Sequence, residues 1–351
     1  MNNNLGVEPV KCLLCNGQTI IKDNAFPSYQ ESITFEIRHC LNCMVAFSMP
    51  RMKDTKDLYD KIYKNGSKVR YYDRYWNYAE KVKNIENPLD YLAESEDTYW
   101  GVRSALKTII KDKSATKILE VGSGLGYLTY GLRMAGYDTL GIDISEAAVK
   151  NAIINFGNHY IASDVFDFAE KNVGFFDIVI LTEVIEHVDN PIAFIDVLLK
   201  LIKPSGRIII TTPNKSLYPS NITWSSDLPP VHCWWYSEDS ISYIANILNA
   251  KVEYVDYSNY FKKNSNWVYT FDVAKPAFDK NGNLLEYENK VQTSSVFFTI
   301  KKSLMLKPYF RSMYIYLKKM LIYIRSVFDS KVIICSVRGP GMCAILEKNK
   351  I

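Results

Sequence analysis

Four of the seven cysteines stand in two close pairs near the start of the chain. Two residues separate Cys12 from Cys15 and Cys40 from Cys43, and 24 residues lie between the pairs. A two-residue spacer lets both thiolates of a pair turn toward one ion, and the second pair completes a tetrahedron. We therefore predict a structural zinc site with four cysteine ligands, which leaves no open position for water.

Alternatives to this ligand set are free or redox-active cysteines, or His39 replacing its neighbour Cys40 as a ligand. Disulfides are not expected, because the N-terminus has no basic segment followed by an apolar one, as a secreted chain would. Residues 1–50 are predicted to form a zinc ribbon with a strand over Ser32–His39, and so small a module needs a metal to be stable.

A second group of residues suits the binding of a nucleoside. Gly122, Gly124 and Gly126 follow a short apolar run, where they permit a sharp turn and let backbone N–H groups approach a ligand closely. A dinucleotide fingerprint would need glycine where this chain has Tyr127, so a ligand without a pyrophosphate is favoured. Asp143 ends the next apolar run, where its carboxylate can accept hydrogen bonds from a ribose diol.

The chain has only four histidines, and two of them are candidate catalytic bases. His187 follows the fourth predicted core strand and His232 lies in the loop after the fifth, so both belong at the carboxyl edge of a parallel sheet. Histidine suits proton abstraction from a hydroxyl near neutral pH. Glu186 is a further candidate base. The alternatives are that His187 only holds its loop and that Glu186 is a solvated carboxylate; His39 and His159 are interpreted as structural.

These residues need a scaffold, and the pattern from residue 117 onward predicts one. Short β-branched runs alternate with amphipathic helical stretches. The predicted strands are Lys117–Val121, Asp138–Ile142, Tyr160–Ala162, Asp177–Leu181, Arg207–Thr211, Val252–Tyr257 and Gly341–Glu347, and the predicted helices are Gly126–Met134, Ser145–Asn155, Asp164–Lys171, Pro191–Leu201 and Glu238–Leu248. This order predicts a Rossmann-like, doubly wound α/β fold with a mostly parallel seven-stranded sheet.

Five segments are predicted along the chain. They are a zinc ribbon (1–50), a helical cap or linker (51–115), the α/β core (116–259), an insertion (260–338) and the last core strand (339–351). Between Val296 and Lys331 the insertion carries eight basic residues and one acidic residue. Its stretch 304–328 has helical spacing of aromatic, aliphatic and basic residues, which suits contact with an anionic membrane surface or a lipid-linked substrate. The alternative is a helix packed on this chain or on a partner subunit.

Composition excludes several classes of protein. With 48% hydrophobic residues, 16 glycines and 13 prolines, the chain is neither collagen-like nor disordered. No apolar run approaches the roughly 20 residues of a membrane span, so we expect a cytoplasmic protein, with 304–328 as a contact to the inner face of the membrane. A net charge of +4 indicates no general affinity for nucleic acid.

The sequence resembles the class I S-adenosylmethionine-dependent methyltransferases. The resemblance lies in ILEVGSGLGYLTYGL (118–132), GIDIS (141–145), SDV (163–165), FDIVILTEVIEHV (176–188), LIKPSGRIIITTPN (201–214) and GMCAILEK (341–348). It implies that the three glycines hold the methionine part and ribose of the cofactor and that Asp143 binds the ribose hydroxyls. It also implies that Asp164 meets the adenine amino group and that Glu183 lines the pocket near the methyl group. Glu120, Ile144 and Val165 stand in the same blocks and are expected in that pocket.

Two further resemblances bear on the acceptor. The cysteine-rich segment resembles the zinc ribbon of a bacterial branch of these enzymes that is associated with sugars and other small polar molecules. EVIEHV and the segment Pro229-Pro230-x-His232 resemble the ubiquinone-type O-methyltransferases. Together they imply O-methylation of a sugar or sugar nucleotide, or of a lipid-linked glycan, in surface-polysaccharide or secondary metabolism. S-adenosylmethionine and a structural zinc ion would be the cofactors.

The aromatic loop 221–236 suits an acceptor with a flat or pyranose face, and its alternative is a packed lid. Two other functions stay open. An RNA methyltransferase would need a basic ribbon, whereas Lys22 and Arg38 here face three acidic residues of the same segment. A non-catalytic scaffold that kept the fold would not need the intact glycines with Asp143 and Asp164.

Overall fold

The computed structural model describes residues 10–52, 57–58, 61–62, 65–69, 72–217, 228–264, 268–270, 275–285 and 332–349. The predicted helix at 304–328, most of the predicted insertion and residues 221–227 of the aromatic loop lie outside this part of the chain. Within it, no helix is long and apolar enough to cross a membrane.

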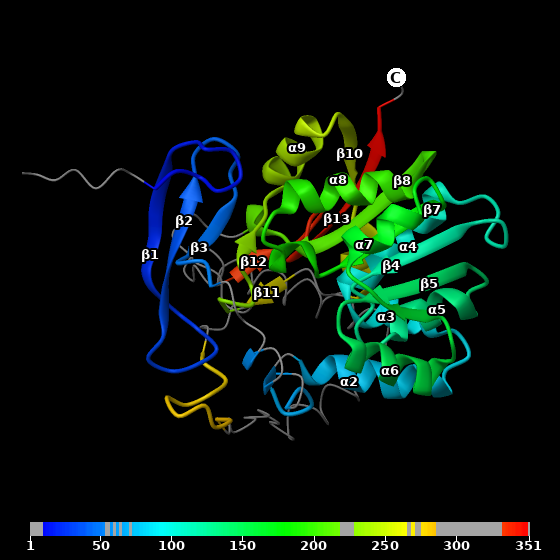
Figure 1. The fold of residues 1–351 in the computed structure, drawn as a ribbon, viewed down its shortest axis with the longest axis horizontal. Helices are drawn as coiled ribbons and strands as arrows, with labels where there is room; N and C mark the ends of the chain where they lie inside the picture. Colours follow the sequence, from blue (N-terminus) through cyan, green and yellow to red (C-terminus); the bar gives the residue numbers. More distant parts are fainter. Residues whose placement is uncertain are drawn as a thin grey trace, which may run out of the picture.

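The described residues form a seven-stranded core sheet in the order β10-β13-β8-β7-β4-β5-β6 (Figure 1). Its strands are β4 (Lys117–Val121), β5 (Asp138–Asp143), β6 (Tyr160–Ala162), β7 (Phe176–Thr182), β8 (Ile202–Pro213), β10 (Ala250–Tyr254) and β13 (Gly341–Lys348). The five strands from β8 to β6 run parallel, and β13 is antiparallel to both β8 and β10. The predicted doubly wound, mostly parallel seven-stranded sheet is confirmed.

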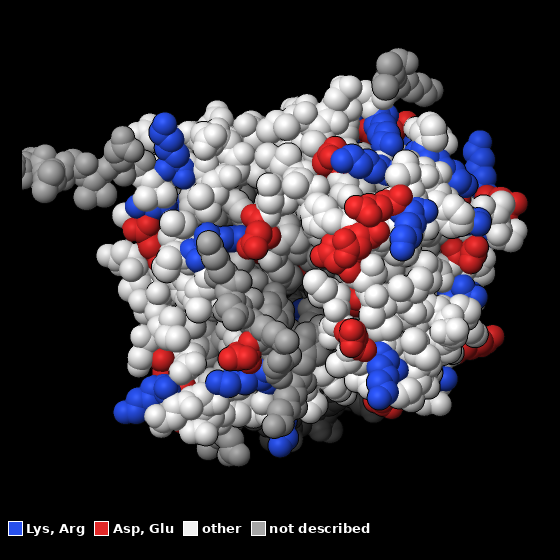
Figure 2. All heavy atoms as spheres, viewed as in Figure 1, with Lys and Arg blue, Asp and Glu red and all other residues white. Residues whose placement is uncertain are grey.

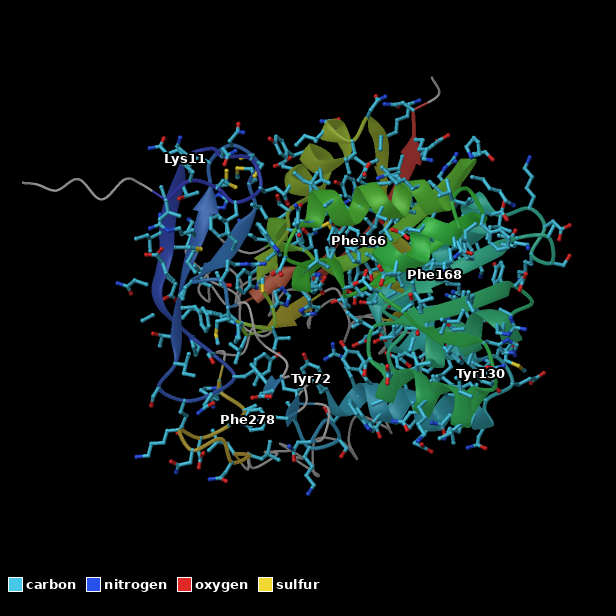
Figure 3. All side chains as sticks on the ribbon, viewed as in Figure 1. Lys11, Tyr72, Tyr130, Phe166, Phe168 and Phe278 are labelled. Atoms are coloured by element: carbon cyan, nitrogen blue, oxygen red, sulfur yellow. The ribbon has the colours of Figure 1, made fainter. Side chains whose placement is uncertain are left out.

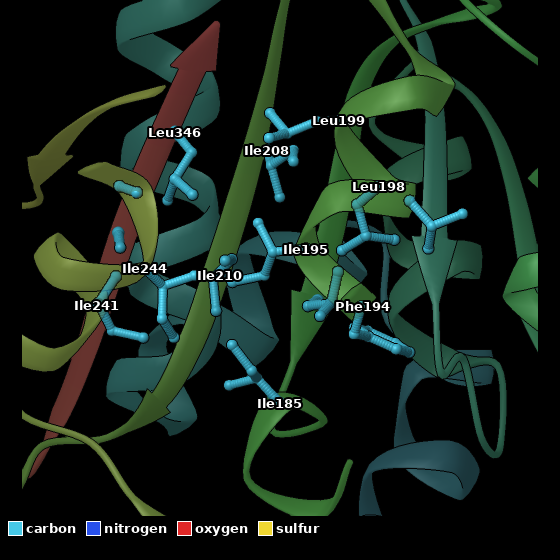
Figure 4. Close-up of a cluster of buried hydrophobic side chains, with 14 of the residues drawn as sticks. Ile185, Phe194, Ile195, Leu198, Leu199, Ile208, Ile210, Ile241, Ile244 and Leu346 are labelled. Atoms are coloured by element: carbon cyan, nitrogen blue, oxygen red, sulfur yellow. The ribbon is translucent and has the colours of Figure 1, made fainter. Parts of the chain in front are cut away.

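Helices cover both faces of the core sheet. They are α4 (Asp97–Ile109), α5 (Tyr127–Met134), α6 (Glu146–Phe156), α7 (Val165–Lys171), α8 (Pro191–Leu201), α9 (Glu238–Ile247) and the single turn η2 (Ile185–His187). Successive residues of β8 enter opposite cores: Ile208 and Ile210 pack with α8 and α9, whereas Ile209 packs with the cluster on the other face (Figure 4). The run of apolar residues in β8 therefore reflects burial on both sides.

The described part of 51–115 is largely helical, as predicted. It contains α2 (Asp73–Lys81), η1 (Val82–Asn84), α3 (Pro88–Ser95) and α4. Pro88 stands at the first turn of α3, where a missing N–H costs nothing. Buried residues of α3 and α4, such as Leu92 and Leu106, belong to the same apolar cluster as Ile209. This segment is thus packed on the core and is not a free linker.

The N-terminal segment forms a second, four-stranded sheet, which we call the N-terminal sheet. Its order is β1 (Thr19–Pro27), β2 (Thr34–Cys40), β3 (Ala46–Met49) and β9 (Trp234–Trp235). Sequence patterns predicted only the second of these strands. The fourth comes from the loop after β8, so the N-terminal sheet and the core share a chain segment. A small two-stranded sheet pairs β11 (Val268–Thr270) with β12 (Val332–Ile334).

Two predictions about local structure need correction. Trp234, Trp235 and Tyr236 are 0–2% exposed, so they do not form a platform for an acceptor. Trp234 and Trp235 pair with β3, and all three side chains lie in apolar clusters, Trp235 in a different one from the other two. The strand predicted at Val252–Tyr257 is β10, Ala250–Tyr254, because the Tyr257 amide donates to Val337 O outside the ladder.

Candidate functional site

The four paired cysteines meet at one end of the N-terminal sheet. The Sγ atoms of Cys12 and Cys43 are 3.7 Å apart, those of Cys15 and Cys40 are 3.4 Å apart, and all four lie within 4.8 Å of one another. Sulfur ligands of a tetrahedral zinc ion, at about 2.3 Å from the metal, lie about 3.8 Å apart. The residues therefore fit a zinc ion.

Backbone amides add to this fit. Leu14 N donates to the Cys12 sulfur at 3.4 Å and Gly17 N to the Cys15 sulfur at 3.3 Å. The hydrogen bond shared by Cys12 and Cys43 lowers the pKa of the Cys12 thiol and raises that of Cys43, so one proton is held between two sulfurs whose thiolate form binds metal. His39, the alternative ligand, has its Nδ1 3.1 Å from Lys215 Nζ and is not in the four-sulfur group.

The glycine loop, residues 122–126, joins β4 to α5 at the carboxyl edge of the core sheet. Gly122 has φ +76°, and a Cβ atom there would lie 2.5 Å from Val184 Cγ2. Gly126 has φ +82°, and its Cβ would lie 2.6 Å from the Ala152 side chain and 2.8 Å from the Tyr160 ring. Both positions therefore require glycine, which brings β7, α6 and β6 against the loop.

Asp143 ends β5 beside the glycine loop. Its carboxylate accepts hydrogen bonds from Gly124 N and Ser145 N, both at 2.8 Å, and it is 9% exposed. Burial raises the pKa of this carboxyl. The next residue, Ile144, is 76% exposed. A carboxylate fixed next to an exposed apolar side chain suits a ribose diol with an adjoining base.

The loop after β6 supplies a second exposed apolar side chain. Asp164 Oδ1 accepts from Phe166 N at 2.7 Å and so caps α7. Val165 is 5% exposed and belongs to the apolar core, whereas Phe166 is 46% exposed on the side of the core nearer the N-terminal sheet (Figure 3). Phe166, which the sequence analysis did not select, is therefore better placed than Val165 to pack against a flat ring. Its position two residues after the expected adenine-binding Asp164 was the available signal.

Glu120 lies behind the glycine loop, away from its outer surface. The side chain is buried at 2% exposure, and its Oε2 accepts a hydrogen bond from Thr129 of α5. Burial raises the pKa of Glu120 to about 8. The structure thus gives Glu120 a place between β4 and α5, where it can orient the loop and need not touch a ligand.

Glu183 follows β7 in a strained conformation, with φ +54°. Its amide donates to Thr211 O at 3.1 Å. Burial raises the pKa of Tyr75 and of Tyr257, and the Glu183 charge adds to both shifts. Near them the Tyr127 hydroxyl shares a hydrogen bond with Tyr99 of α4. Of these tyrosines, Tyr75 and Tyr99 belong to the segment that sequence patterns described only as helical and rich in aromatic residues.

The three candidate catalytic residues come together. Glu186, His187 and His232, which we call the histidine cluster, each place a ligand atom within 4.8 Å of the others. The two imidazole rings are 5.4 Å apart at 78°, and His187 Nε2 is 3.9 Å from Glu186 Oε1. Thr212 donates to Glu186 Oε2 at 2.9 Å. Glu186 is 1% exposed, so it is not the solvated carboxylate of the alternative interpretation.

The histidine cluster can act in two ways. His187, with its side chain 27% exposed, is the member that an acceptor can reach, because His232 is 2% exposed. His187 Nδ1 lies 2.7 Å from Val231 O; a hydrogen bond there would leave Nε2 as the proton-accepting atom. One carboxylate and two imidazoles can also hold a divalent cation. Sequence patterns predicted these residues as bases and did not predict that they could hold a cation.

Residues 96–255 match the profile of the methyltransferase domain family. By this match, residues 96–255 form a methyltransferase domain. The matched range includes the glycine loop, Asp143, Asp164, Glu183 and the histidine cluster, and it excludes the four paired cysteines. The glycine turn and the Asp143 carboxylate described above fit the cofactor that the resemblance implied.

Curated proteins with similar sequences include ubiquinone biosynthesis O-methyltransferases. The chain is 29% identical over 153 residues to a ubiquinone biosynthesis O-methyltransferase of Vibrio campbellii, covering 41% of this chain and 59% of that protein. It is 27% identical over 235 residues to the mitochondrial ubiquinone biosynthesis O-methyltransferase of Bos taurus, covering 60% of each. The chain thus spans less than two thirds of the length of these relatives. A solved methyltransferase structure from Archaeoglobus fulgidus matches 70% of this chain and 93% of its own, at 16% identity and TM-score 0.40.

Proposed function

We propose that this chain transfers the methyl group of S-adenosylmethionine to a hydroxyl group of a small polar molecule. The carrying observation is the placement of the histidine cluster beside the glycine loop: Val184 packs on Gly122, and Glu186 and His187 follow within one turn. A base and a methyl donor would therefore share one edge of the core sheet.

The cofactor, when bound, supplies an electrophilic methyl group on a positively charged sulfur. The chain has to bind it, orient the acceptor and take up the hydroxyl proton. Asp143 and the glycine loop would hold the nucleoside, and Ile144 with Phe166 would pack on its base. His187 Nε2 would accept the acceptor proton, while Glu186 and His232 hold the ring and the charge that forms on it.

For the acceptor we keep the prediction of a sugar or sugar nucleotide, and a specific observation favours a second class. The relatives are named for ubiquinone biosynthesis, which favours an aromatic diol. No sugar acceptor appears in those names, and burial of Trp234 and Trp235 removes the platform that had supported a pyranose ring. An RNA acceptor is less favoured, because the described residues on the face in Figure 2 intersperse both charges without a continuous basic patch there.

Calorimetric titration with S-adenosylmethionine and S-adenosylhomocysteine tests the cofactor site, with Asp143→Ala as the control. Saturable binding that the control loses supports the proposal; no binding by the folded, zinc-loaded chain contradicts it. Methyl transfer is then assayed with nucleotide sugars and with catechol as a simple aromatic diol. Turnover of the zinc-loaded chain, kept free of chelator, is measured with and without added Mg²⁺ or Mn²⁺, which tells the two uses of the histidine cluster apart because a base needs no added metal.

A further inference from the structure

The loop that carries His232 is held by the N-terminal sheet. Strand β3 pairs with β9 in register Phe47↔Trp234, and Ser48 N donates to Cys233 O at 3.1 Å. Phe47 and Trp234 lie in one apolar cluster with residues of β8 and α8. The backbone directly after His232 is therefore fixed by a part of the chain that lies outside the methyltransferase domain.

A single arginine connects both histidine-bearing segments. Arg51, two residues beyond β3, donates from Nη1 to Cys233 O at 3.2 Å and from Nη2 to Val188 O at 3.4 Å. The same Nη2 atom is 3.4 Å from Asp189 Oδ1, and the guanidinium lies 4.9 Å above the Trp234 ring. Its side chain is 19% exposed. Arg51 thus bonds to the residue that follows each of the two histidines.

Other contacts carry this connection to the imidazoles. Cys233 N donates to Glu186 O at 2.9 Å, and the His187 ring contacts Val231 O. The His232 ring stacks on Trp235, with centroids 5.1 Å apart and planes at 27°. A displacement of β9 would therefore change both the separation and the tilt of the two rings.

We propose that Arg51 is a positioning residue for the histidine cluster and that the N-terminal sheet is the scaffold that sets its geometry. That the histidine cluster is catalytic is taken from the proposed function, and the inference rests on it. A guanidinium presents several N–H donors in a fixed plane, so it can hold two backbone carbonyls at a set distance. Misplacement of a catalytic group by about 1 Å can cost about 100-fold in rate.

The test compares Arg51→Met with Arg38→Met. Arg38 is a matched control: it lies in β2 of the same sheet, its side chain is 13% exposed, and it bonds to Glu36 and Thr19 without contact to either histidine segment. NMR spectra of the four imidazoles, assigned with single His→Gln variants, report the geometry without any assay of activity. We expect the His187 and His232 signals to move in Arg51→Met and to stay in Arg38→Met.

In kinetics, we expect Arg51→Met to lower kcat about 10- to 100-fold while the Kd for S-adenosylmethionine stays within about twofold. Arg51→Lys should recover part of kcat, because it keeps a charge over Trp234 and one donor for Cys233 O. If Arg51→Met does not fold, Arg51→Lys carries the same measurements.

Unchanged imidazole signals with unchanged kcat would overturn the inference, as would an equal effect of Arg38→Met. The proposed function fails separately: if the native chain binds no cofactor or methylates no acceptor, the imidazole signals still decide on Arg51.

Discussion

The glycine loop with Asp143, which we call the cofactor edge after its proposed role, lies beside the histidine cluster, yet the two are built in opposite ways. At the cofactor edge, Asp143 is held by the amides of Gly124 and of its own turn. The histidine cluster is held by Arg51 and β3, which are far from it in the sequence. Pairing of β4 with β5, which follow one another in the sequence, brings the first site together, whereas pairing of β3 with β9, far apart in the sequence, brings the second together. The two sites should therefore respond to different changes.

His187→Gln should give the largest difference between the effect on turnover and the effect on cofactor affinity. Loss of a positioned base lowers kcat by about 10²- to 10⁴-fold, and the Kd for S-adenosylmethionine should stay within about twofold, because Asp143 and the glycine loop are unchanged. Turnover assays and calorimetry measure the two effects. His159→Gln is the control, since His159 contacts neither site; a His187 variant with full turnover removes this residue from the mechanism.

Removal of zinc should give the next effect. The native chain should carry about one zinc per molecule, and Cys40→Ser or a strong chelator should destabilise the N-terminal sheet, because binding of a structural metal contributes directly to folding. We expect kcat to fall by about 100-fold through β3 and β9, with cofactor affinity largely kept. Metal analysis, thermal melting and turnover measure this. Because Mg²⁺ binds poorly to thiolates, added Mg²⁺ should not restore the turnover of Cys40→Ser. If cofactor binding falls as much as turnover, the two sites do not depend on different parts of the chain.

Gly124→Ala should affect the cofactor edge alone. A Cβ at Gly124 has no neighbour within 4 Å, and φ is +48°. The free energy of unfolding should therefore fall by only about 1–2 kcal/mol, which is the cost of a left-handed backbone for alanine. A ligand that approaches the backbone closely would meet the new methyl group, and the Kd should rise about 10-fold or more. The imidazole signals of His187 and His232 should not move. Equal cofactor affinity in the variant would show that the loop does not face the ligand.

The last effect is a pH dependence of stability that arises from Glu120 behind the glycine loop. Burial raises the pKa of Glu120 from 4.5 to about 8, so the fold favours its neutral form. Its contribution to stability is therefore complete below pH 4.5 and is lost as the pH rises toward 8. Glu120→Gln cannot ionise and keeps an acceptor for Thr129. Relative to the native chain, its free energy of unfolding should rise by about 3 kcal/mol between pH 6 and 9.

Urea unfolding at the two pH values measures this difference. Asp112→Asn is a surface control, because Asp112 is exposed and its carboxylate bonds only to its own turn. An identical stability difference for Glu120→Gln at both pH values would show that Glu120 is ionised in the folded chain.

The alternation of apolar runs with amphipathic stretches was enough to predict the strands and helices of the core, because strand and helix periodicities are local properties of the sequence. The same holds for the four paired cysteines, whose two-residue spacers fix each pair, and for the glycine loop with Asp143. Sequence patterns also selected Glu186, His187 and His232, since strand ends in a parallel sheet meet at one edge.

Only the tertiary structure decided which of these side chains are buried and which are exposed. Glu120 and Val165 turn inward while Phe166 turns outward, because burial depends on the neighbouring helix and not on position in a motif. Likewise, Trp234 and Trp235 gave an aromatic signal that suits either a ligand platform or a core. Pairing with β3, from the other end of the chain, made them core, and no local pattern records a contact between strands so far apart.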